Sequence, residues 1–165
     1  MQRQRRLAPL TSPIMLLVFV ILCLLAGRLG AMITAPALET WYPTLVKPDW
    51  TPPNVVFPVA WSLIFLAIGI AAWLVWKHAE RGELGLPLGL FFLQLGLNVA
   101  WSFAFFGLQD PLLGLFVLAA LIGAVVATTL SFAKIMRAAG WLFLPYILWL
   151  GYAAALNLAI WRLNA

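Results

Sequence analysis

Long apolar segments separated by short polar ones dominate this chain. The apolar runs are about 20 residues long, the length that a helix needs to cross a bilayer, and they lack the strict alternation of barrel strands. The pattern predicts helices at about 14–34, 54–76, 86–107, 111–133 and 141–162. We therefore expect an all-α integral membrane protein, in which residues 1–165 form a single domain built as a bundle of five transmembrane helices.

The longest interruption between the apolar runs is residues 35–53, APALETWYPTLVKPDWTPP. Its prolines remove backbone donors and break helical periodicity. Its tryptophans and tyrosine make it too aromatic for a simple linker. We predict a long loop here that belongs to a functional site.

The composition is far from that of a soluble domain, with 65% hydrophobic and 9% charged residues. The net charge of +5 could indicate a nucleic-acid-binding protein. However, the lysines and arginines form short clusters between apolar runs, whereas nucleic-acid binding requires one continuous basic face. We therefore expect no nucleic acid as a partner.

The basic residues predict an orientation instead. Five spans place the two termini on opposite sides of the membrane, and cytoplasmic loops carry the excess of Lys and Arg. We therefore expect a cytoplasmic N-terminus, and the short, arginine-rich start favours a bacterial cell envelope. The N-terminal side holds Arg3, Arg5, Arg6, Lys77, Arg81, Lys134 and Arg137, and the other side holds Arg28, Lys47 and Arg162.

No catalytic or metal-binding set of residues is evident. The single cysteine, Cys23, lies in an apolar run and the single histidine, His78, lies in a polar segment. All five acidic residues fall in predicted loops, and neither a Gly-rich phosphate loop nor a Ser-His pair is present. We expect no metal, no required cofactor and no conventional enzyme.

Nine tryptophans are unusually many for 165 residues. Six lie near predicted helix ends, where indoles anchor a protein at the membrane interface: Trp41, Trp50, Trp73, Trp76, Trp141 and Trp161. Trp61, Trp101 and Trp149 lie deeper, where an indole N–H needs a partner. At about 1.5 Å per residue, Trp61 lies roughly 10 Å below the loop end of its helix. Asn98 and Asn157 fall at a comparable depth.

Helical spacing places these residues on shared faces. A mostly aromatic wall with a few polar groups is typical of a ligand pocket. Alternatively, the amides are hydrogen-bonding contacts between helices, and the sequence leaves both interpretations open. The three faces are Phe57, Trp61 and Phe65; Gln94, Asn98 and Trp101; and Tyr146, Trp149, Ala153 and Asn157.

A further stripe of small residues, Gly96, Ala100 and Ala104, follows the spacing that allows close approach of a second helix. We expect a homodimer through this stripe. Packing against a helix of the same chain is the alternative.

Three motifs make the chain resemble the translocator protein family, also called tryptophan-rich sensory or peripheral-type benzodiazepine receptor-like proteins. They are WYPTLVKPDWTPPNVVFPVAW at 41–61, QLGLNVAWSFAFFG at 94–107 and PYILWLGYAAALNLAIWRLN at 145–164. The resemblance covers nearly the whole chain, in the right order.

The resemblance implies binding of porphyrins such as protoporphyrin IX and haem, with sterols and synthetic ligands bound by some members. It assigns Trp50, Trp61, Phe65, Asn98, Trp101, Trp149, Ala153 and Leu156 to the pocket, and the shared helix faces add Tyr146 and Asn157. Residues 156–162 lack the tyrosine of the sterol-recognition pattern, so a sterol is a weak candidate and a tetrapyrrole is favoured.

Three functions remain open at this point. The favoured one is a membrane receptor or translocator that binds porphyrin and serves tetrapyrrole transport or signalling. The second is an enzyme that degrades porphyrin in light with the help of pocket tryptophans. The third is a structural protein that its tryptophans anchor in membrane lipid, which would not require the three deep indoles.

Overall fold

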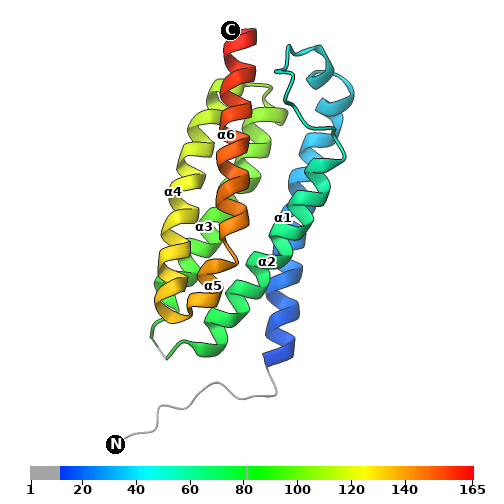
Figure 1. The fold of residues 1–165 in the computed structure, drawn as a ribbon. Coiled ribbons are helices and arrows are strands. Elements are labelled where there is room, and N and C mark those ends of the chain that lie inside the picture. The colour runs from blue at the N-terminus through cyan, green and yellow to red at the C-terminus, as the bar shows by residue number, and fades with distance from the viewer. Residues whose placement is uncertain (1–11, 81) are drawn as a thin grey trace, which may run out of the picture.

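The computed structural model describes residues 12–80 and 82–165. Within them the chain is helical and has no strands (Figure 1). The helices are α1 (Ser12–Glu39), α2 (Val56–His78), α3 (Gly85–Ser102), α4 (Pro111–Ile135), α5 (Arg137–Trp141) and α6 (Leu144–Asn164). In these residues five spans are long and apolar enough to cross a membrane, with π-helix η3 (Phe103–Gly107) completing the third and α5 with α6 forming the fifth. The predicted all-α membrane protein is confirmed.

The first helix is longer than predicted, and the loop is correspondingly shorter. We expected α1 to end at residue 34, but it continues through Pro36 to Glu39. Pro36 cannot donate to the Met32 carbonyl four residues earlier and its ring crowds that carbonyl, yet the helix continues for three more residues. The Thr40 hydroxyl donates to the Pro36 carbonyl at 2.8 Å and caps this last turn. Glu39, expected in a loop, is thus the last residue of α1, and the short 3-10 helix η2 (Tyr42–Thr44) follows.

The last span is broken rather than continuous over 141–162 as predicted. Pro145 lies in the first turn of α6, and in an unbroken helix its ring would clash with the Trp141 carbonyl. The predicted turn at 134–140 reduces to Met136, whose extended backbone (φ −148°) separates α4 from α5. The other predicted helix boundaries agree with the structure to within two residues.

The order of the helices around the bundle differs from their order in the chain, because α1 lies between α2 and α3. α1 lies along α2 and α3, α3 along α4, and α4 along α6, while α5 contacts α2 at the end opposite to the loop. There the core is filled by rings that are fully buried. Phe91 stacks on Phe132 at 6.1 Å, and Phe132 meets Phe143 edge-on at 5.4 Å. This half of the bundle is therefore closed by aromatic packing.

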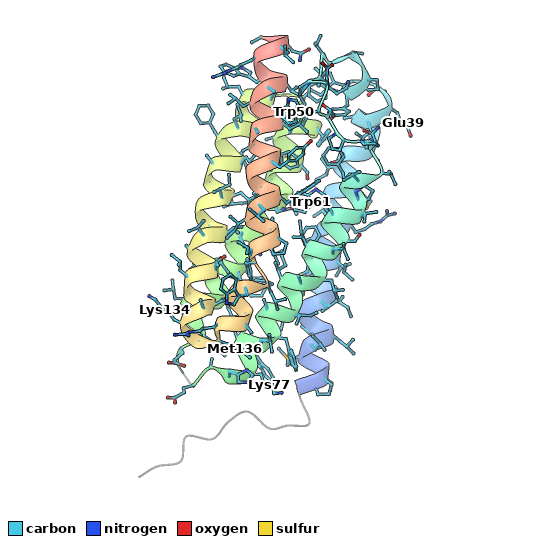
Figure 2. All side chains as sticks on the ribbon, in the orientation of Figure 1. Glu39, Trp50, Trp61, Lys77, Lys134 and Met136 are labelled. Carbon is cyan, nitrogen blue, oxygen red and sulfur yellow. The ribbon has the colours of Figure 1, made fainter. Side chains whose placement is uncertain are left out.

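The first and last helices of the described chain have their free ends at opposite ends of the bundle (Figure 1). α1 begins at the end opposite to the loop, and α6 ends beside the loop (Figure 1). Lys77 and Lys134 lie at the first end, and Glu39 and Trp50 lie at the loop end (Figure 2). Arg3, Arg5, Arg6 and Arg81 lie outside the described residues. The cytoplasmic N-terminus stays a prediction.

The small-residue stripe on α3 is only partly covered by this chain. A Cβ atom placed on Gly96 would meet nothing within 4 Å. Ala100 is half-buried, and Ala104 is buried inside the bundle. Only the part around Gly96 is thus free to meet another helix, and the homodimer stays a prediction.

We predict that Gly69→Ala destabilises the bundle. A Cβ atom at Gly69 would lie 2.9 Å from the Val20 Cα, so the α1 backbone itself must move, and overpacking of this kind costs about 1–3 kcal/mol. The measurement is thermal unfolding in detergent, followed by alkylation of the buried Cys23 thiol as it becomes exposed.

Gly123→Ala is the matched control, because nothing lies within 4 Å of its added Cβ. Alanine stabilises a helix by about 1 kcal/mol relative to glycine, so this control keeps or raises the midpoint of thermal unfolding. An unchanged midpoint in Gly69→Ala would contradict the close α1–α2 contact.

Candidate ligand-binding site

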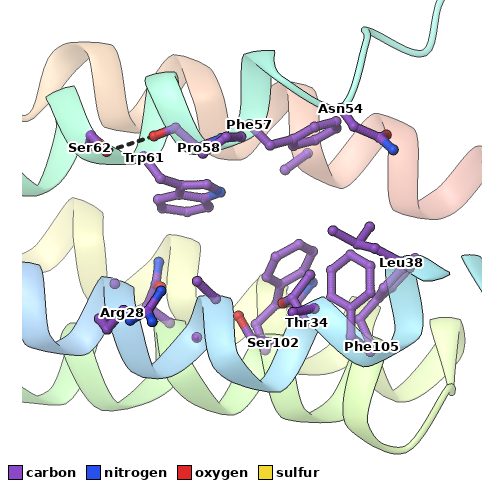
Figure 3. A pocket seen from close by; sticks show the side chains of 18 of the residues that line it. Arg28, Thr34, Leu38, Asn54, Phe57, Pro58, Trp61, Ser62, Ser102 and Phe105 are labelled. Atoms are coloured by element: carbon purple, nitrogen blue, oxygen red, sulfur yellow. Dashed lines mark hydrogen bonds between the residues drawn. The ribbon is translucent and has the colours of Figure 1, made fainter.

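A cavity of about 560 Å³ lies in the half of the bundle nearest the long loop. α2 runs along one side of it and α1 along the other (Figure 3). Side chains of α3, η3 and α6 complete the wall, and Tyr42 and Asn54 contribute from the loop. The volume lies in the range of small-molecule sites, about 300–1,000 Å³.

The α2 side of the cavity is aromatic. Phe57, Trp61 and Phe65 all line it, as their shared helix face predicted. Trp61 stacks on Phe65 with ring centroids 5.6 Å apart. The α6 residue Trp149 supports this wall from outside the cavity, edge-on to Trp61 at 6.4 Å and to Phe57 at 5.8 Å. A flat apolar guest would therefore meet a braced aromatic surface.

Two amides in the cavity wall also bridge helices. Asn98 Nδ2 donates to the Tyr146 hydroxyl at 2.9 Å. Trp101 Nε1 donates to Asn157 Oδ1 at 3.2 Å, and Asn157 Nδ2 donates to the Pro111 carbonyl at 2.8 Å. The interhelical role therefore holds for both amides. Their position in the wall makes them the polar groups of the cavity as well.

Gln94 of α3 behaves differently from Asn98, one turn away on the same helix, and from Asn157 of α6. It is fully buried one turn further from the loop and does not line the cavity. Neither atom of its amide has a hydrogen-bond partner within residues 12–80 and 82–165. Its hydrogen-bonding capacity thus remains unused below the cavity.

The α1 side of the cavity was not predicted from the sequence. Its glycines let α1 come close to the neighbouring helices. A Cβ on Gly27 would lie 2.6 Å from the Phe65 ring. The α1 lining residues include Gly27, Arg28, Gly30, Ala31 and Thr34.

The loop at the cavity end is tied to α6 by reciprocal hydrogen bonds. The Val46 N–H donates to Asn164 Oδ1, and Asn164 Nδ2 donates to the Val46 carbonyl, both at 2.9 Å. The Tyr152 hydroxyl donates to the Trp50 carbonyl at 3.1 Å, and the two rings lie 5.7 Å apart. The loop is therefore fastened to the last helix at two places.

The loop is also braced internally around Tyr42. Lys47 Nζ donates to the Tyr42 carbonyl at 2.8 Å and to the Leu45 carbonyl at 2.9 Å, and it lies 4.8 Å from the centre of the Tyr42 ring. Burial, and to a smaller extent the nearby Tyr152, raises the pKa of Tyr42 above its ordinary value of 10.0. The phenol therefore stays neutral at the edge of the cavity.

The structure brings most of the predicted site residues to the cavity. Three do not line it: Trp50 lies exposed on the loop against Tyr152, Tyr146 is fully buried behind Asn98, and Trp149 lies behind Trp61. Sequence reasoning missed Ser102 and Phe105, although they lie near Asn98 and Trp101 in the same motif. The predicted residues that line the cavity are Trp61, Phe65, Asn98, Trp101, Ala153, Leu156 and Asn157.

The site offers binding surfaces rather than an acid–base pair. In the described residues no group of three His, Cys, Asp or Glu side chains could hold a metal ion. The cavity wall contains one charged side chain, Arg28, and otherwise aromatic, aliphatic and neutral polar groups. Such a wall suits the capture of a largely apolar ligand.

Comparison with known proteins identifies relatives across nearly the whole chain. The sequence model of the TspO/MBR family matches residues 19–162 of this chain. The tryptophan-rich protein TspO of Archaeoglobus fulgidus is 43% identical over 92% of this chain and 99% of its own length. The tryptophan-rich protein TspO of Chlorobaculum tepidum is 39% identical over 87% of this chain and 91% of its own length. The human translocator protein is 38% identical over 75% of each chain.

We predict that Asn164→Asp loosens the loop. A carboxylate cannot donate to the Val46 carbonyl, so one of the two reciprocal hydrogen bonds is lost and two acceptors face each other. Hydrogen–deuterium exchange of peptides covering residues 42–53 measures the effect, and we expect about tenfold faster exchange there, with the spans unchanged.

The neighbouring variant Leu163→Ala changes an exposed side chain at the same helix end and is the control. Equal protection of the loop in Asn164→Asp and Leu163→Ala would contradict the proposed attachment to α6.

Proposed function

Because this chain belongs to the TspO/MBR family, we propose that it binds porphyrins such as protoporphyrin IX and haem, and related flat hydrophobic ligands, in the cavity beneath the loop. It would act as a membrane receptor or translocator linked to tetrapyrrole transport or signalling. The observation that carries the proposal is a cavity of about 560 Å³ with both Trp61 and Trp101 in its wall.

The shape of the aromatic wall favours a flat guest. Trp61 and Phe65 lie nearly parallel, at an interplanar angle of 28°, and Trp101 stacks in the same way on Phe105 at 28°. In each pair the indole is only partly buried while the phenylalanine is buried, so the indole offers the ring surface on which a disc-shaped ligand can lie. One such aromatic contact contributes about 0.5–1.5 kcal/mol beyond the area that it buries.

The polar groups of the wall support orientation of the guest. Asn98 and Asn157 are held in fixed directions by their bonds to Tyr146 and Pro111. Fixed polar groups in an apolar cavity select ligands by the position of their own polar atoms. A porphyrin with polar substituents on one edge fits this arrangement.

Light-dependent porphyrin degradation is the second candidate function. Its support is the cluster of oxidisable rings around Trp61, which contacts Tyr146 at 5.9 Å and Trp149 at 6.4 Å. In such a reaction an indole would transfer an electron to the photoexcited porphyrin. Progressive loss of the porphyrin absorption band under illumination in air, abolished in Trp61→Phe, would favour this candidate.

We predict that Trp61→Phe and Trp101→Phe each weaken protoporphyrin IX binding about three- to tenfold, because each removes part of an aromatic contact. The measurement is a titration of the purified protein in the dark, followed by the porphyrin absorption band. Trp141→Phe is the control, because this indole is 70% exposed and lies outside the cavity.

Saturable binding with the same affinity in all four proteins would place the porphyrin outside the cavity. Unsaturable binding to the wild type would mean that porphyrin only partitions into the detergent, and the proposal would then be wrong.

A further inference from the structure

An arginine lies in the cavity wall without a counter-charge. Arg28 lines the cavity from α1 and is exposed, which places it at the rim of the cavity rather than at its floor (Figure 3). No ion pair or hydrogen bond holds its guanidinium within residues 12–80 and 82–165. The acidic residues lie at helix ends or in loops, and none lines the cavity.

The depth of Arg28 makes this lack of a partner costly. It lies eleven residues before Glu39, the end of α1, which is about 16 Å along the helix axis. α1 has 28 residues and is therefore about 42 Å long, exceeding the hydrocarbon thickness of about 30 Å by about 6 Å at each end. Arg28 then lies about 10 Å inside the hydrocarbon boundary. Ionisable residues at such depths usually mark a substrate site or pair with an opposite charge.

The surroundings of Arg28 keep its guanidinium available for a ligand. Its neighbours in the α1 wall, Gly27 and Ala31, are small, and Trp61 and Ser62 face the same cavity from α2. The Ser62 hydroxyl donates to the Pro58 carbonyl of its own helix at 2.7 Å. The guanidinium is thus the one cationic group in a wall that is otherwise aromatic, aliphatic or neutral.

We propose that Arg28 recognises a carboxylate on the edge of the bound ligand, so that the site selects flat hydrophobic acids over their neutral analogues. This inference rests on the proposed binding of flat ligands in the cavity. The ligand ring lies between the aromatic walls, and its acidic substituent remains at the rim, where the planar guanidinium offers two parallel N–H donors. Charge pairing at this depth stabilises both partners, since neither is well solvated there.

Protoporphyrin IX and its dimethyl ester provide the test, because they share one ring system and differ in carboxylate charge. Both are titrated in the dark into the full chain in nanodiscs of phosphatidylcholine, which carry no anionic lipid. We expect the wild type to bind the free acid at least about tenfold more tightly than the ester. The reason is that only the free acid offers Arg28 a charged hydrogen-bond acceptor. Arg28→Gln removes this difference by weakening acid binding while ester binding stays the same. Arg28→Lys keeps part of the preference.

Arg162→Gln is the matched control, since it removes an exposed arginine of α6 that does not line the cavity. It should keep the full preference for the acid. Equal wild-type affinity for acid and ester, or a full acid preference in Arg28→Gln, would overturn the role of Arg28 while leaving porphyrin binding in place. Unsaturable binding of both compounds to the wild type would overturn the proposed function and this inference with it.

Discussion

The cavity depends on how closely α1 approaches α2 and α3. Gly27 faces the Phe65 ring, and Gly30 faces Ser102, whose hydroxyl oxygen would lie 3.0 Å from an added Cβ. Because these positions carry no side chain, α1 contributes bare backbone to the wall and leaves the space beside it open. The same approach brings Arg28 to the rim. A larger residue at either glycine would fill the space or displace the helix.

Aromatic side chains are arranged differently in the two halves of the bundle. Opposite to the loop, Phe91, Phe132 and Phe143 fill the interior completely. Near the loop, rings stand along the wall and leave the centre open, while the bonds of Asn98 and Asn157 hold α3, α4 and α6 together. Polar groups in hydrocarbon need partners, and these bonds provide them without closing the cavity. Asn98 and Asn157 thus both hold helices together and line the cavity.

Hydropathy and spacing predicted much of this arrangement. The five spans followed from segment length, and the shared face of Phe57, Trp61 and Phe65 followed from helical periodicity. The sequence did not predict which residues of α1 line the cavity, because a helix that is apolar all round gives no periodic signal for the side that faces the bundle. The break before α6 can be explained from the sequence by Pro145. The continuation of α1 through Pro36 cannot, because it depends on local capping by Thr40. The placement of Trp149 behind Trp61 depends on helix rotation, which spacing alone does not fix.

The central claim of this account is that a tetrapyrrole lies inside the bundle, between α1, α2 and α6. The most direct measurement is an experimental structure of the protein with protoporphyrin IX bound in a bilayer. We expect density for the ring in the cavity, against Trp61 and beneath the loop that Asn164 fastens. Porphyrin density on the outer, lipid-facing surface, with the cavity unchanged, would contradict the account.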